Sequence, residues 1–144
     1  MSSLWIGLCV AAAGAATVIQ SAANAGLATR IGLPAALVVN TSIVLAAALV
    51  YYFARGSSGT FFPPETPWSY YVGGLCGFAV ILSLALAFPR IGAGVAIALV
   101  VLGQGAAALA IDHFGLLGMP TEPVTVARIA GLVLVGGGIV LIRT

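Results

Sequence analysis

Long uncharged, apolar runs fill most of this chain, and charged residues occur only singly between them. These runs predict five helices, over residues 4–28, 34–54, 68–88, 93–111 and 124–142. Each approaches or exceeds the roughly 20 apolar residues that cross a bilayer core about 30 Å thick. A backbone in lipid must satisfy its own hydrogen bonds, and the runs lack the alternating polarity of barrel strands. The pattern therefore predicts an all-α membrane protein.

Composition supports this interpretation. Hydrophobic residues make up 62% of the 144 residues and charged residues 6%, with a net charge of +2 and a mean hydropathy of +1.22. Soluble domains carry about 25% charged residues, so a soluble fold is excluded. Five basic residues, all arginine, are too few for a phosphate-binding surface, so no nucleic-acid partner is expected. We expect one five-helix transmembrane domain over residues 1–144, with the first helix kept as a mature span because no basic residue precedes it.

Glycine and proline divide the chain at the expected helix ends. Residues 30–34 form a tight connection, and residues 55–67 form the longest polar loop. Residues 89–92 are read as a very short turn that makes the third and fourth helices an antiparallel hairpin. Residues 115–123 separate the fourth helix from the fifth. No internal repeat is apparent in this arrangement.

Polar side chains inside the expected spans are the main candidates for function, because burying them in lipid is costly. The first helix carries Thr17, Gln20, Ser21 and Asn24 at three- and four-residue steps, which places them on one stripe. The second helix adds Asn40, followed by Thr41 and Ser42, and Gln104 lies near the middle of the fourth. Two interpretations stay open. These groups hold helices together, at about 0.6–2 kcal/mol each, or they line a polar cavity. The candidate substrate-binding residues are Gln20, Asn24, Gln104, Asn40 and Thr17.

No acidic or basic residue lies in the middle of any expected span. Asp112 and His113 end the fourth helix, and Arg128 begins the fifth on the same side. Eight residues separate Asp112 from Gln104, which suggests a shared helix face. An Asp112–Arg128 ion pair is the simpler expectation, and a coupling role for Asp112 and His113 is the alternative. With a single histidine and two cysteines inside spans, we expect no metal site, no cofactor and no enzymatic activity.

The chain also has features of a half-transporter. Many transporters place their substrate between inverted repeats, and this chain could supply such symmetry by pairing with an inverted copy of itself. Arg55 and Arg128 lie on one side of the membrane, and Arg30, Arg90 and Arg143 lie on the other. That is almost no positive-inside bias. Glycines of the last helix are expected to pack the dimer: Gly131, Gly136, Gly137 and Gly138.

Several motifs resemble one known family. Gln20 and Asn24, followed by Leu27, resemble the opening of the inner-membrane exporters called YdcZ-like, in the drug/metabolite transporter superfamily. Residues 103–104 with 111–118, residues 89–92, and residues 128–131 resemble other parts of it. The resemblance implies a bacterial inner-membrane protein with five helices, half of a ten-helix inverted-repeat transporter. It implies no particular substrate. The first helix lacks the essential glutamate of the related small multidrug pumps, which argues against cation antiport of their kind.

Three functions fit these observations. The first is a secondary transporter that exports a small metabolite as an antiparallel homodimer by alternating access. The second is a dual-topology channel, and the third is a non-transporting membrane scaffold subunit. Polar stripes on three helices favour transport over a scaffold. We predict the exporter, with the lipid bilayer and a small neutral, zwitterionic or weakly charged solute as its partners.

Overall fold

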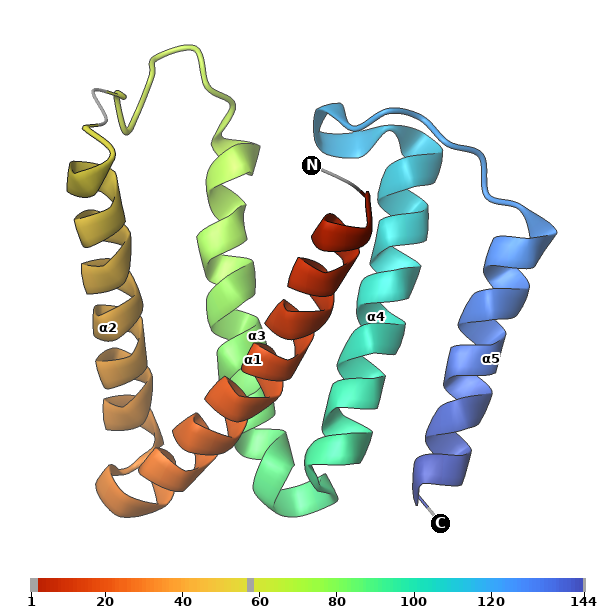
Figure 1. The fold of residues 1–144 in the computed structure, drawn as a ribbon, viewed down its shortest axis with the longest axis horizontal. Helices are drawn as coiled ribbons and strands as arrows, with labels where there is room; N and C mark the ends of the chain where they lie inside the picture. Colours follow the sequence, from red (N-terminus) through yellow and green to blue (C-terminus); the bar gives the residue numbers. More distant parts are fainter. Residues whose placement is uncertain (1–2, 57–58, 144) are drawn as a thin grey trace. The chain divides into compact units, whose positions relative to one another are not determined.

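The computed structural model describes residues 3–56 and 59–143, and their regular structure is entirely helical. Four helices are long and apolar enough to cross a membrane, and a shorter apolar helix covers Val126–Ile142. The chain forms two compact units, and the boundary between them falls within α3, after Leu86. The elements, drawn in Figure 1, are α1 (Ser3–Ile31), α2 (Leu33–Ala54), η1 (Trp68–Tyr71), α3 (Val72–Ile91), α4 (Ala93–Phe114), η2 (Leu116–Gly118) and α5 (Val126–Arg143).

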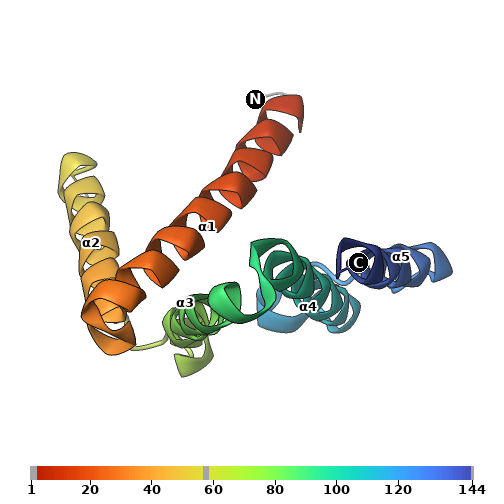
Figure 2. The ribbon, with the colours of Figure 1, turned by 90° about the horizontal axis from the view of Figure 1, so that it is seen from below.

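In the first unit, α1 packs against α2 near the turn that joins them. Both views show the two helices meeting at this turn and separating away from it (Figures 1 and 2). The buried residues of the pair lie at the joined end, and all of α1 from Ser3 to Ala16 is exposed. The buried set is mixed, because Ala36 and Leu37 are apolar whereas the rest are polar: Ser21, Asn24 and Asn40.

The α1–α2 and α3–α4 turns have the same construction. Gly32 has φ 84 and ψ 150, and Gly92 has φ 80 and ψ 157. This region of backbone space is essentially confined to glycine. At each turn the glycine N–H donates to a carbonyl four residues earlier, and the glycine carbonyl accepts from the N–H four residues later, at 3.0–3.1 Å. Each glycine also follows an Arg-Ile pair.

These turns correct two expectations. Residues 89–91 do not form a turn, because α3 continues through Pro89 to Ile91 and only Gly92 lies between the helices. The chain also does contain a repeat, since Arg-Ile-Gly recurs 60 residues further along with the same geometry. Proline lacks only the N–H, so Pro89 fits in the last turn of a helix when the backbone bends to accommodate its ring. The repeated unit is the helical hairpin.

In the second unit, α4 and α5 lie side by side (Figure 1) and pack through small residues. A Cβ built on Gly105 would lie 2.8 Å from Leu132 Cδ1, so the glycine permits this close approach. Further along the pair, Gly136 faces Leu102 and Gly94 faces Ile142. Glycine at a helix crossing lets backbones approach closely, which gives van der Waals contact its largest effect in a membrane.

Candidate functional site

Two predicted residues of the first unit meet directly. Gln20 Nε2 of α1 donates a hydrogen bond of 3.4 Å to Asn40 Oδ1 of α2. Asn40 is only 9% exposed, and its Nδ2 is buried without a hydrogen-bond partner among the described residues. A single bond between two amides leaves the second polar atom of Asn40 unpaired whichever way the amides are oriented. The α1–α2 contact therefore contains a buried polar atom that helix packing does not satisfy.

The other polar residues of the α1 stripe surround this pair. Thr17 Oγ1 donates to Ala13 O at 2.9 Å, and Ser21 Oγ donates to Thr17 O at 2.7 Å. Both hydroxyls are thus satisfied within their own helix. Asn24 lies one turn closer to Gly32 and is 7% exposed. We refer to Gln20, Asn24 and Asn40 as the amide cluster.

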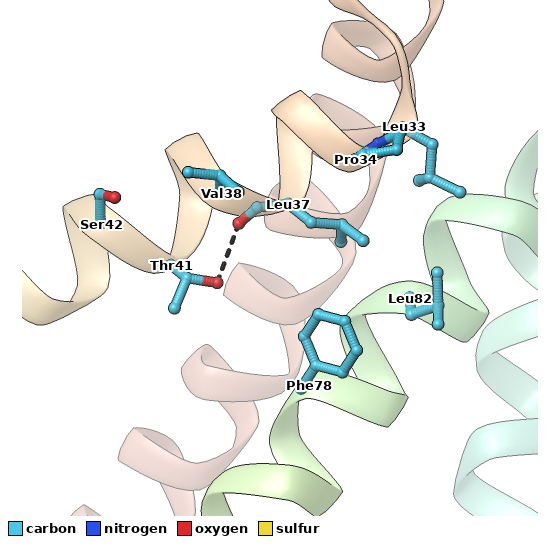
Figure 3. Close-up of a pocket in the computed structure, with 8 residues that line it drawn as sticks. All are labelled: Leu33, Pro34, Leu37, Val38, Thr41, Ser42, Phe78 and Leu82. Atoms are coloured by element: carbon cyan, nitrogen blue, oxygen red, sulfur yellow. Dashed lines mark hydrogen bonds between the residues drawn. The ribbon is translucent and has the colours of Figure 1, made fainter.

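A cavity of about 590 Å³ lies between α2 and α3 of the same unit, within the size range of small-molecule sites. Figure 3 shows Phe78 and Leu82 of α3 facing Leu37 and Thr41 of α2. The Thr41 hydroxyl donates to Leu37 O at 2.8 Å, so the lining is effectively apolar. Sequence reasoning did not include Phe78 or Leu82, because apolar residues in an apolar span carry no distinguishing signal.

Gln104, the remaining amide candidate, belongs to the second unit. It lies midway along α4, and its side chain is exposed. Asp112, by contrast, is half-buried and faces α5 through Arg128. Eight residues correspond to about 80° around an ideal helix, so the expected common face of Gln104 and Asp112 is wrong. Gln104 lies on a flank of α4, beside the α5 contact.

A charged cluster joins the ends of α4 and α5. Arg128 Nη1 lies 3.5 Å from Asp112 Oδ2, and Nη2 donates to Glu122 Oε2. The Glu122 N–H also donates to Asp112 O at 2.8 Å, which folds the loop back onto α4. His113 Nδ1 accepts a 3.4 Å hydrogen bond from the Val124 N–H. Glu122 was not predicted as part of this cluster, because a glutamate in a loop can point in any direction.

The four glycines expected to pack a dimer do not share one face. Gly136 packs against Leu102 of the same chain, whereas a Cβ on Gly131, Gly137 or Gly138 would meet nothing within 4 Å. Gly131 and Gly138 are two turns apart and share one side of α5, and Gly137 is on another. The expectation is therefore corrected for Gly136, which serves the α4–α5 contact.

Helices of this length and hydropathy, with their apolar side chains exposed, define an integral membrane protein that crosses the bilayer several times. Residues 4–141 match the family described as "Putative inner membrane exporter, YdcZ". The chain belongs to this YdcZ family and is a multi-pass protein of the inner membrane, as the motifs of the first helix and of residues 103–118 predicted. No curated protein and no solved structure matches it.

Proposed function

We propose that this chain is a secondary exporter of a small neutral or zwitterionic solute, and that the amide cluster and Gln104 bind that solute. The observation that carries the proposal is the unpaired, buried amide of Asn40 beside Gln20. Buried polar groups are normally paired, and a solute polar group supplies the missing partner. The family description assigns export across the inner membrane.

The repeated hairpin supports a role for these amides beyond helix packing. Asn24 lies eight residues before Gly32, and Leu84 lies eight residues before Gly92. Both are buried, at 7% and 3% exposure, and Ala36 and Ala96 are buried at matching positions after the turns. The same turn thus forms with leucine in the place of asparagine. Because the hairpin does not need the amide, we infer that Asn24 is retained for solute contact.

The depths of the polar residues support one shared pathway. Asn24 and Asn40 lie eight residues from Gly32 along their helices, Gln20 lies twelve, and Gln104 lies twelve from Gly92. At 1.5 Å per residue these separations are about 12–18 Å. The middle of the hydrocarbon core lies about 15 Å from either surface. No charged residue occurs at this depth, which favours a neutral or zwitterionic solute over a hard cation.

We further propose that two copies in opposite orientations form the transporter and alternate access to this pathway. Five helices are half of the ten-helix plan, and few large side chains of the described chain are buried. The exposed sides of Gly131 and Gly138 provide a surface for close packing of α5 against its partner. The arginine counts on the two sides differ by one, so both orientations are energetically accessible.

Thermal unfolding of purified protein tests the solute proposal. The probes are a panel of amino acids, a panel of sugars and polyols, and a quaternary ammonium cation as the contrasting class. A solute at 100 times its dissociation constant adds about 2.7 kcal/mol of stability. We expect stabilisation by a member of the first two panels and its loss in Gln104→Leu, with the unliganded melting temperature unchanged. Stabilisation by the cation alone, or unfolding of Gln104→Leu, contradicts the proposal.

Cysteine labelling in intact cells tests the assembly. Cys9 and Cys76 are exposed free thiols, so both are first replaced by alanine. A single cysteine is then introduced beside Arg143 and treated with a membrane-impermeant maleimide before and after permeabilisation. Two orientations in comparable amounts predict about half of the labelling before permeabilisation. Labelling that is entirely complete, or entirely absent, before permeabilisation rejects a homodimer of opposite orientations.

A further inference from the structure

An open groove of about 300 Å³ runs along the α4–α5 contact and is chemically different at its two ends. One end is bounded by the ion pair of Asp112 and Arg128. The body is apolar, with a glycine, Gly105, that keeps the two helices close. Its apolar walls are formed by Val101 and Leu109 of α4 and by Leu132 and Val135 of α5.

The groove has the length of one membrane leaflet. Asp112 lies near the end of α4 and Arg128 near the start of α5, so the charged end is at the membrane surface. Eleven residues separate Asp112 from Val101, a rise of about 16 Å in a helix. Half of the hydrocarbon core is about 15 Å thick. An occupant that enters from the charged end therefore reaches the bilayer midplane with its tail.

The charged end offers partners of both signs. The side chains of Arg128, Asp112 and Glu122 are 37%, 41% and 59% exposed, so a headgroup can reach all three. Two carboxylates and one guanidinium leave an excess of negative charge. Arg128 Nη1 lies in ion-pair range of Asp112 but has no hydrogen bond to the described residues, so the guanidinium retains donors. An anion beside Arg128 and an ammonium beside the carboxylates would satisfy this end.

We propose that the groove binds one zwitterionic phospholipid of the phosphatidylethanolamine type, with an acyl chain along the α4–α5 contact. Its phosphate accepts from Arg128, and its primary ammonium donates to Glu122 and Asp112. A purely anionic lipid lacks the group that neutralises the excess carboxylate. A trimethylated ammonium has the charge but no N–H donor. The site is separate from the amide cluster and from Gln104, which does not line the groove.

Native mass spectrometry of the purified full chain tests this proposal. The protein in mild detergent is titrated with phosphatidylethanolamine, phosphatidylcholine and phosphatidylglycerol that carry identical acyl chains. We expect one tightly held phosphatidylethanolamine, with a preference of roughly five-fold over either other lipid, the scale of a partly exposed charge pair. Glu122→Gln should reduce this preference toward equality. Equal retention of the three lipids by wild type overturns the proposal.

A matched pair of substitutions on α5 tests the groove itself. Val135 lines the groove, whereas Val133 is 66% exposed outside it. Val135→Trp fills the groove and should lower phosphatidylethanolamine retention at least five-fold, and Val133→Trp should not. Equal retention in the two variants overturns the site. If Val135→Trp fails to fold, the headgroup comparison in wild type and Glu122→Gln decides alone.

The same measurement separates this proposal from the proposed function. Gln104→Leu should retain its bound phosphatidylethanolamine even when it no longer responds to solutes. Displacement of the lipid by a soluble amino acid would assign the groove to the solute and overturn the lipid site.

Discussion

Replacement of Asn40 by leucine separates solute binding from helix packing. The change removes one 3.4 Å hydrogen bond to Gln20, worth about 0.6 kcal/mol in a membrane protein. It also removes a buried donor that has no partner among the described residues, and such a group costs about 1–3 kcal/mol. We therefore expect Asn40→Leu to be at least as stable as wild type. The same change deprives a bound solute of one neutral hydrogen bond, which weakens binding roughly three- to ten-fold.

Thermal unfolding with and without solute measures both effects together. At a concentration that stabilises wild type by about 2.7 kcal/mol, a ten-fold weaker variant gains only about 1.4 kcal/mol. Thr41→Val is the matched control, because Thr41 is the next residue and its hydroxyl bonds only its own helix at Leu37 O. It should keep the full solute response. The reasoning fails if Asn40→Leu loses more than about 2 kcal/mol of unliganded stability, or if its solute response equals that of wild type.

Three further predictions concern the hairpins and the charged cluster. Gly32→Ala should lower stability by about 1–3 kcal/mol because φ is 84 there, whereas Gly26→Ala, in open space within α1, should raise it slightly; equal melting temperatures would contradict this. Gly105→Ala should lower stability, because the new Cβ would lie 2.8 Å from Leu132 and displace it; an unchanged melting temperature would show that Leu132 moves without cost. Arg128→Gln should destabilise by about 1 kcal/mol at low salt and less at high salt, and a loss independent of salt would exclude an electrostatic origin.

The helices were predictable because a long uncharged run in lipid has only one satisfactory backbone conformation. The polar stripe was predictable because Gln20 and Asn24, four residues apart, must project from one side of a helix. The contact of Gln20 with Asn40 was within reach of the sequence only as far as the short connection at Gly32. That connection makes the two helices antiparallel neighbours, but their register depends on the turn geometry.

The remaining features depend on three-dimensional detail that local sequence does not encode. Pro89 was taken as the start of a turn, yet the turn is formed by Gly92 alone, as at Gly32. Phe78 contributes to the cavity only because α3 lies beside α2. Glu122 meets Arg128 because the loop folds back through its own N–H onto Asp112. The recurring Arg-Ile-Gly triplet was a sequence signal that could have revealed the common turn.

Solute exchange by proteoliposomes that contain only this purified chain tests the central claim most directly. The solute is the amino acid or sugar that stabilises the protein most, supplied inside the vesicles unlabelled and outside with a radiolabel. The account predicts saturable accumulation of label in wild type and Thr41→Val, a strong reduction in Asn40→Leu, and none in Gln104→Leu. Accumulation that is absent in wild type, or equal in all four proteins, would contradict the claim that these mid-membrane amides carry an exported solute.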